Sequence, residues 1–286
     1  MKKAIALMIV LGFITLIISL LISIYAIYDK YSNNNFEKTI SQDSIIIHNI
    51  TPILNNLSKK IKNDDDLKRI CGKYPNILIN DNIKMDVEIT PLFNRININQ
   101  FSTKNIGINK FLDNIFDVYN ISNIDFFKNL LLDTIDTDDK KREFNTEIKF
   151  ENPYFQDGGI YSYKHFKMIL NYFVKNTKDY NIYKVPWKKL FYFKTIKTNF
   201  IDCNFINKEF IKILGLDIEN INCNTIKENI DKQLLKELAI IPFKTKNPFY
   251  LEITVKYYLN NIESILYFIY DIKTKKVISF EKHPIY

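Results

Sequence analysis

The sequence predicts an α+β protein with a long N-terminal helix, an antiparallel sheet and a large all-helical domain inserted into that sheet. Three observations lead to this prediction. The N-terminal residues combine an uninterrupted apolar segment with apolar positions at helical spacing. Strand patterns occur at residues 83–98 and again at residues 249–282, and the residues between them have helical periodicity. Strands on both sides of one helical block are most simply explained as a sheet interrupted by an insertion.

The N-terminal segment has the length and composition of a membrane anchor. Lys2 and Lys3 precede residues 4–28, which contain no Asp, Glu, Lys or Arg. A helix of this length spans about 37 Å, more than the ~30 Å hydrocarbon core of a bilayer. A cleaved signal peptide would have a shorter apolar region and a small-residue cleavage site. Because the lysines precede the span, we expect a single-pass protein with a cytoplasmic N-terminus and the rest of the chain across the membrane.

An amphipathic helix is predicted to continue from the anchor, followed by a β-hairpin. The apolar positions of the helix recur at intervals of three, four and seven: Phe36, Ile40, Ile47, Ile50, Leu54, Leu57 and Ile61. The helix is expected to end near residues 63–66. Residues 83–89 then alternate as a strand, Thr90 and Pro91 form a turn, and residues 93–98 alternate again, which predicts two paired strands.

Helix start signals recur through the middle of the chain. They are Ser122 with Asp125, Ser162, Pro186, Asn207 with Gly215 as a stop, and Thr225 with Glu228. Beyond Pro242, three strands joined by short turns are predicted at residues 249–259, 263–272 and 276–282. The chain therefore divides into a membrane helix with a short leader (1–28), an extended helix with the first hairpin (29–99), an inserted helical domain (100–245) and the C-terminal strands (246–286).

Composition narrows the function classes. The 286 residues are 47% hydrophobic and 14% aromatic, which indicates a folded chain, and the net charge of +8 comes from lysines interspersed with acids. A nucleic-acid-binding surface would need those lysines clustered on one face. The chain has no G-x-S-x-G motif, phosphate loop or dinucleotide fingerprint, and its three histidines stand far apart. We therefore expect neither nucleic-acid binding nor catalysis.

The cysteines allow two interpretations. Cys71, Cys203 and Cys223 would lie in a compartment that permits disulfides, and the odd number leaves at least one of them unpaired. Cys203 and Cys223 flank an apolar helical segment, so a bond between them would close a short loop and contribute about 3 kcal/mol. Three buried free thiols are the alternative.

One acidic segment could hold a cation. Residues 130–142, LLLDTIDTDDKKR, pass from three leucines to four aspartates and then to three cations. An ordinary helix end, a solvated loop, a catalytic acid pair and a hard-cation site all share this pattern, but calcium is favoured over acid catalysis because it takes six to eight oxygens from flexible loops. Asp136, Asp138 and Glu147 hold the first, third and twelfth positions of an EF-hand. Two lysines stand where that motif needs a ligand and a glycine, so it is not an EF-hand.

Four stretches of the sequence resemble general secretion pathway protein K, the minor pseudopilin family of type II secretion systems. In chain order they are KAIALMIVLGF, FNRININ, LLLDTIDTDD and IDCNFINKEFIKILG, and the family's motifs have the same order. Ala4 and Thr134 differ, because they stand where the family has glycine and tryptophan. The resemblance covers nearly the whole chain and implies a pilin-like fold, with the membrane helix continuing into a long helix that packs on the sheet.

The resemblance also implies functional residues. Calcium binding in the family implies oxygen ligands from the acidic segment, against the alternative of a solvated helix end. The candidate ligands in this chain are Asp136, Asp138, Asp139 and Glu143, with Asp157 a weaker candidate. Prepilin peptidase is expected to cut between Ala4 and Ile5. After that cut, Ile9 stands at the fifth position, where a filament subunit is expected to carry a glutamate that pairs with the subunit above.

The implied function is to initiate or cap a periplasmic pseudopilus that drives protein export. The protein would sit in the cell inner membrane with its C-terminal part in the periplasm. Its expected partners are other minor pseudopilins at the filament tip, the inner-membrane assembly platform and prepilin peptidase. The first alternative is a minor pilin of a type IV pilus or DNA-uptake filament. The second is a membrane-anchored binding or catalytic domain unrelated to filaments.

Overall fold

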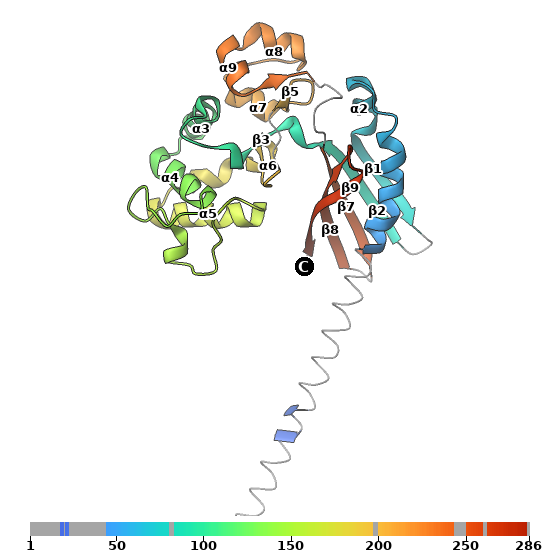
Figure 1. Ribbon diagram of the computed structural model, residues 1–286, viewed down its shortest axis with the longest axis horizontal. Coiled ribbons are helices and arrows are strands. Elements are labelled where there is room, and N and C mark those ends of the chain that lie inside the picture. The colour runs from blue at the N-terminus through green and yellow to red at the C-terminus, as the bar shows by residue number, and fades with distance from the viewer. Residues whose placement is uncertain are drawn as a thin grey trace, which may run out of the picture. The chain divides into compact units, whose positions relative to one another are not determined.

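The computed structural model describes residues 18–19, 21–22, 44–79, 83–196, 200–242, 250–259 and 262–284 (Figure 1). Within these ranges, no helix is both long enough and apolar enough to cross a membrane. The predicted span of residues 4–28 lies outside the described residues, apart from the two helical pairs at 18–19 and 21–22. Ala4, Ile5 and Ile9 lie outside them too, so membrane insertion and leader cleavage stay predictions.

Residues 44–58 form a helix with one buried apolar face. The buried apolar residues lie at intervals of four, which places them on one side of the helix: Ile46, Ile50 and Leu54. This helix ends sooner than predicted. Asn63 begins a separate short helix, α2 (Asp64–Ile70), by accepting a backbone hydrogen bond with its side chain. The predicted packing of helix 44–58 on the sheet stays a prediction.

A five-stranded antiparallel sheet forms the second part of the fold, and it confirms the α+β prediction. Its strands in spatial order are β1 (Gly72–Ile79), β2 (Ile83–Pro91), β7 (Tyr250–Leu259), β8 (Ile262–Asp271) and β9 (Lys276–Pro284). Along β7, residues 251, 253, 255 and 257 are buried, whereas the residues between them are half-buried or exposed. This is the period-two pattern of a strand with one face on a core.

The predicted hairpin of residues 83–89 and 93–98 is wrong. β2 pairs with β1 on one side and with β7 on the other. β1 was not predicted, because its sequence GKYPNILI contains a proline and its register shifts around Asn76, where φ is +57°. Residues 93–98 leave the sheet instead, and Ile96–Asn97 form β3, which pairs in parallel with β4 (Phe191–Tyr192).

The chain between β2 and β7 forms a helical part. Its helices are α3 (Ile106–Tyr119), α4 (Ile124–Ile135), α5 (Tyr163–Thr177), α6 (Trp187–Leu190), α7 (Lys208–Ile213), α8 (Cys223–Asn229) and α9 (Lys232–Glu237). Short 3-10 helices η1 (Leu92–Asn94) and η2 (Ile98–Gln100) precede α3, and η3 (Ile148–Phe150) and η4 (Tyr180–Lys184) lie between α4, α5 and α6. β5 (Ile201–Asp202) and β6 (Ile240–Ile241) pair in parallel. Because β2 and β7 are neighbours in the sheet, the helical part is an insertion between adjacent strands.

Aromatic side chains dominate the core of the helical part. Trp187 is 1% exposed and its ring lies 5.5 Å from that of Phe127 in α4 and 5.2 Å from that of Phe166 in α5. Its indole N–H donates to the Ile182 carbonyl at 2.9 Å. Each buried aromatic contributes up to about 3 kcal/mol through burial alone. These contacts hold α4, α5 and α6 together, and Figure 1 shows α4 beside α5.

Two of the predicted helix starts are correct. Ser162 accepts a hydrogen bond from the His165 N–H at 3.0 Å at the start of α5. Asn207 accepts one from the Phe210 N–H at 3.0 Å at the start of α7. Gly215 follows α7 with φ of +73°, a left-handed conformation that suits glycine after a helix.

Other predicted starts differ from the structure. Ser122 bonds to Asp179 rather than capping α4. Thr225 is the third residue of α8, whose N-cap is Asn222. Pro186 precedes a helix of four residues only, because the chain turns into β4 at Phe191. At Ser122 a distant residue, Asp179, competes with the local signal, whereas at Thr225 the stronger cap is the neighbouring Asn222.

The helical part contacts the sheet directly. Leu92 of η1, Tyr192 of β4 and Ile269 of β8 form a small buried cluster. Two ion pairs cross the same boundary, Arg95 with Glu252 and Lys194 with Glu281.

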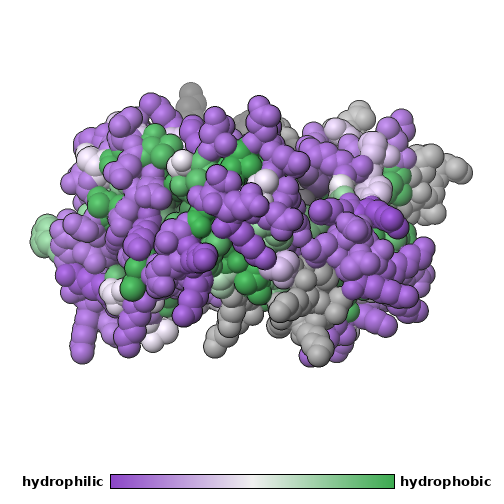
Figure 2. Space-filling model, turned by 90° about the horizontal axis from the view of Figure 1, so that it is seen from above, coloured by the Kyte–Doolittle hydropathy of each residue, from purple (hydrophilic) through white to green (hydrophobic). Residues whose placement is uncertain are grey.

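On the face seen in Figure 2, hydrophobic residues form small patches among hydrophilic ones.

Candidate metal centre

The acidic segment begins in the last turn of α4 and continues into the loop that follows. Asp133 is completely buried in that turn. Asp136 ends the helix, with its N–H donating to the Leu132 carbonyl at 3.0 Å and an extended backbone of φ −80° and ψ 178°. Asp138 and Asp139 therefore lie in the loop, where both are exposed.

Three carboxylates come together at this loop: Asp136, Asp138 and Glu147. One oxygen from each lies within 4.8 Å of the others. Glu147 immediately precedes η3 and is 2% exposed, yet neither of its carboxylate oxygens has a hydrogen-bond partner among the described residues. Burying a carboxylate without a donor is costly unless a cation compensates. The unpartnered Glu147 is therefore the observation that indicates a cation site.

The environment of Glu147 disfavours its negative charge. Burial and, after it, the Asp157 carboxylate raise the pKa of Glu147 to about 7, against the opposing effect of Lys149. A bound divalent cation would reverse this balance, because an adjacent positive charge stabilises the ionised carboxylate.

Arg142 neutralises part of the acidic cluster. Its guanidinium pairs with Asp133 and, at 2.5 Å, with Asp136. Its backbone N–H also donates to Asp133 at 3.2 Å. Because Asp133 is held from two directions, Arg142 fixes the loop against the end of α4.

Lys149 neutralises the other side of the cluster. Its ammonium pairs with Asp139 and, at 2.9 Å, with Asp157. Hydrogen bonds with these two carboxylates raise the pKa of Lys149, so it is charged at neutral pH. Asp157 reaches the cluster because Gly158, with φ of +88°, donates its N–H to the Asp136 carbonyl at 2.7 Å. A side chain at Gly158 would be strained in this left-handed conformation.

The structure brings together only part of the predicted ligand set. Asp136 and Asp138 belong to the group that includes Glu147. Glu143 is exposed and its carboxylate accepts a hydrogen bond from the Asn129 amide at 3.0 Å. Asp139 is paired with Lys149 at the surface. The sequence contained one signal for Glu147: when Asp136 is taken as the first position of an EF-hand loop, Glu147 is the twelfth.

The residue types in the group fit calcium. Carboxylate oxygens are hard ligands, and three carboxylates supply up to six of the six to eight oxygens that calcium takes. Lys140 and Lys141, which break the EF-hand pattern, are exposed. The geometry thus supports a divalent-cation site built on Asp136, Asp138 and Glu147.

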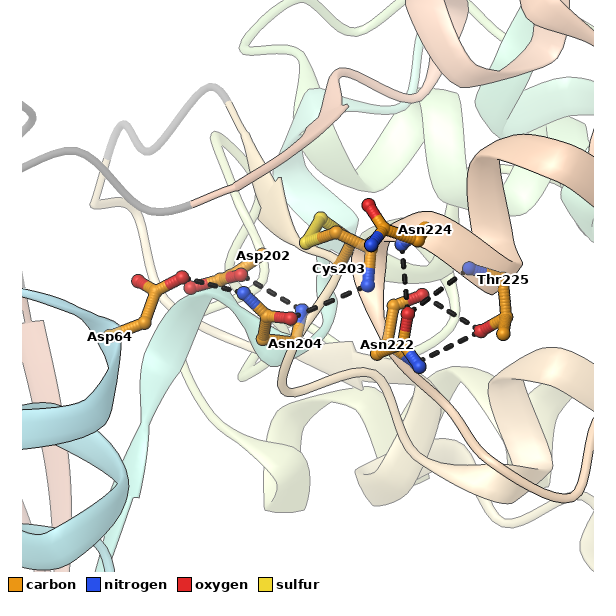
Figure 3. Close-up of a disulfide and its surroundings, with 8 residues drawn as sticks. Asp64, Asp202, Cys203, Asn204, Asn222, Asn224 and Thr225 are labelled. Carbon is orange, nitrogen blue, oxygen red and sulfur yellow. Dashed lines mark hydrogen bonds between the residues drawn. A yellow bond between two sulfur atoms is a disulfide. The ribbon is translucent and has the colours of Figure 1, made fainter.

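A disulfide joins Cys203, just after β5, to Cys223 at the start of α8 (Figure 3). This confirms the pairing that the spacing allowed, and Cys71 is free. Burial raises the pKa of the Cys71 thiol to about 12. Asp202 lies close to the two bonded sulfurs, but sulfurs in a disulfide are not available as thiolate ligands. This second acidic group is therefore not a metal site.

Figure 3 also shows how the disulfide is connected to α2. The Asn204 side chain donates to Asp64 at 2.5 Å, and its carbonyl oxygen accepts from the Cys223 N–H at 3.4 Å. Burial raises the pKa of Asp64, and the hydrogen bond from Asn204 lowers it. Asn204 therefore links the helical part to the segment that precedes the sheet.

The fold and the acidic loop define a class: an α+β protein whose antiparallel sheet is interrupted by a helical insertion that carries a candidate divalent-cation site. No family model and no curated protein matches the sequence. A solved structure that matches is the crystal structure of the GspK–GspI–GspJ complex from the enterotoxigenic Escherichia coli type 2 secretion system. The match has a TM-score of 0.57 and 12% identity, and it covers 89% of this chain and 98% of that chain. At this identity the likeness shows a shared fold.

Proposed function

We propose that this protein is a minor pseudopilin of a type II secretion system, which initiates or caps the periplasmic pseudopilus. The observation that carries the proposal is the extent of the fold match, 89% of this chain and 98% of the matched chain. Coverage of that extent includes most of the insertion between β2 and β7 as well as the sheet. A sheet with a helix is common to many proteins, whereas a large helical insertion at one place in the sheet is a more specific feature.

The proposal places the protein in the cell inner membrane. Residues 4–28 would anchor it, with a cytoplasmic N-terminus and with the sheet and the helical part in the periplasm. The disulfide between Cys203 and Cys223 supports this location, because disulfides persist in oxidising compartments such as the periplasm.

The proposed partners are other minor pseudopilins at the filament tip, the inner-membrane assembly platform and prepilin peptidase. The matched structure is a complex of GspK with GspI and GspJ, which supports partners of this kind. Size supports a position at the tip. A helical part of about 140 residues is some 35 Å wide, whereas packed helices lie about 8 to 10 Å apart. Heads of this width would clash if they were repeated along a shaft.

We also propose that Asp136, Asp138 and Glu147 hold a calcium ion, with Asp157 at the edge of the site. The ion would supply positive charge that the buried Glu147 lacks. Asp136 would keep the ion at the end of α4, and Glu147 would tie it to η3. The loop between these two residues would thereby be closed at both ends.

A secretion assay in the source organism tests the proposed function. Deleting the gene should abolish export of the secreted proteins while DNA uptake and pilus-dependent motility continue, and the full chain supplied in trans should restore export. The opposite pattern would favour a minor pilin of a type IV pilus or DNA-uptake filament. A deletion that changes none of these activities would contradict both filament functions.

A further inference from the structure

A groove of about 670 Å³ lies between the sheet and the helical part. Its floor contains a row of four residues that are direct neighbours across four strands: Glu88, Thr254, Tyr267 and Glu281. Three strand spacings of ~4.8 Å make this row about 14 Å long, the length of an extended segment of about four residues. The volume falls within the range of about 300 to 1,000 Å³ that is usual for binding pockets.

The acidic residues of the groove already have cationic partners. Glu252 pairs with Arg95, and Glu281 pairs with Lys194. The other two also have cations within 4 Å: Glu209 has Lys189 at 3.5 Å, and Glu88 has Lys73 at 3.8 Å. The floor therefore presents no carboxylate that lacks a counter-charge.

Two lysines on the opposite wall differ from these. Lys188 in α6 and Lys208 in α7 line the groove, and neither forms an ion pair with any residue in the described part of the chain. The charges of Glu252 and Glu281 raise the pKa of Lys188, but both carboxylates lie too far from its ammonium to form an ion pair. The groove thus has an excess of positive charge on the wall that faces the sheet.

Lys188 is held in place by aromatic rings from both walls. Its ammonium lies 4.6 Å from the ring centre of Tyr163, in α5, and 5.3 Å from that of Tyr267, in β8. Lys188 is an exposed residue, and desolvation of its ammonium by the surrounding groups is the first cause of its lowered pKa, against Glu252, which raises it. Ser279 on the floor adds a polar atom, since its hydroxyl is buried without a hydrogen-bond partner among the described residues.

We propose that this groove binds an extended, carboxylate-bearing segment of a partner protein, with the carboxylate on Lys188 and the neighbouring side chains against Tyr163 and Tyr267. We choose an acidic occupant because the groove's charges without an ion pair among the described residues, those of Lys188 and Lys208, are positive. We choose a peptide segment because the row of residues on the floor is as long as about four extended residues. This inference is independent of the secretion function and of the calcium site.

Peptide pools that differ at one position test this proposal. The full chain is purified in detergent and titrated with fluorescein-labelled, end-blocked tetrapeptide pools that carry Glu, Gln or Lys at the second position and mixed residues elsewhere. The Glu pool should bind about tenfold tighter than the Gln pool, the effect expected of one charge-assisted hydrogen bond, and the preference should weaken with added salt. The Lys pool should bind least.

Variants assign the preference to Lys188. Lys188→Met should bind the Glu pool no more tightly than the Gln pool, and its continued binding of the Gln pool at native affinity excludes misfolding. Lys188→Arg should keep most of the preference, because it keeps the positive charge. Lys227→Met is the matched control, because Lys227 is an exposed lysine of α8 outside the groove. Equal binding of the three pools by the native chain, no binding of any pool, or a preference that survives in Lys188→Met would each overturn the proposal.

Discussion

The guanidinium of Arg142 lies 2.5 Å from the carboxylate of Asp136. Arg142 thus pairs with one of the three carboxylates that would hold calcium. Lys149 pairs in the same way with Asp157, at 2.9 Å. Glu147 alone of this group has no hydrogen-bond partner and no ion pair among the described residues. A calcium ion would therefore have to compete with Arg142 for Asp136 and with Lys149 for Asp157. It would meet no such competitor at Glu147.

Calcium should stabilise the folded chain. At about a hundredfold excess over the dissociation constant, the free energy of unfolding should rise by ~2.7 kcal/mol. Glu147→Gln combined with Asp138→Asn should abolish this gain, as seen in unfolding midpoints measured with calcium and with chelator. Glu143→Gln should leave it intact, because Glu143 accepts a hydrogen bond from Asn129 outside the group. Native midpoints that coincide with and without calcium would refute the site.

The metal-free chain should lose stability as the pH rises. Burial raises the pKa of Glu147 from 4.5 to about 7, so the folded state binds more protons than the unfolded state between these values. The free energy of unfolding should therefore fall between pH ~4.5 and pH ~7, by on the order of 3 kcal/mol from this one group. The measurement is urea unfolding with chelator at several pH values. Glu147→Gln should flatten the dependence relative to Glu143→Gln, and identical curves for the two variants would contradict it.

Removing the positive charge of Lys149 should tighten calcium binding. Lys149 pairs with Asp139 and Asp157, so it competes with an ion for the acidic cluster. If that pairing is worth about 1 kcal/mol, Lys149→Gln should lower the calcium dissociation constant about fivefold by calorimetry. Lys175→Gln is the control, since Lys175 pairs with Glu151 instead. Weaker binding by Lys149→Gln would show that Lys149 organises the site rather than competing for it.

Loss of the disulfide should destabilise the helical part. Cys203 and Cys223 are 20 residues apart, and a loop of this size contributes about 3 kcal/mol in the chain-entropy model. Cys203→Ser with Cys223→Ser should lower the free energy of unfolding by this amount, whereas Cys71→Ser should change it much less. Thiol titration of the unfolded chain should find one free thiol before reduction, because Cys71 is the free cysteine. Three free thiols before reduction would contradict the bond.

Leader cleavage is expected between Ala4 and Ile5. The two preceding lysines and the following apolar residues match the substrate pattern that the resemblance implies, although Ala4 replaces the usual glycine. Mass spectrometry of the chain extracted from membranes should find Ile5 as the first residue. Ala4→Gly should be cleaved at least as completely. An intact Met1 in the native chain would contradict this prediction.

Features that depend on near neighbours in the chain were determined by the sequence alone. The caps at Ser162 and Asn207 form because a side-chain oxygen three residues before a backbone N–H is enough to start a helix. β7, β8 and β9 were predicted close to their observed positions, because the alternation of apolar residues reflects one face on a core. Two aspartates of the candidate cation site, Asp136 and Asp138, were identified because both lie in one short acidic segment.

Tertiary structure decided what depends on distant partners. The strand beside β2 is β1 and not residues 93–98, because Ile96–Asn97 pair with β4, almost a hundred residues further along the chain. Glu147, rather than Glu143, joins the aspartates, because the chain just before η3 is buried beside them, whereas Glu143 is exposed and bonds to Asn129. A local pattern shows which residues are charged or apolar. It does not show which ones lose their contact with water, because that depends on the elements packed against them.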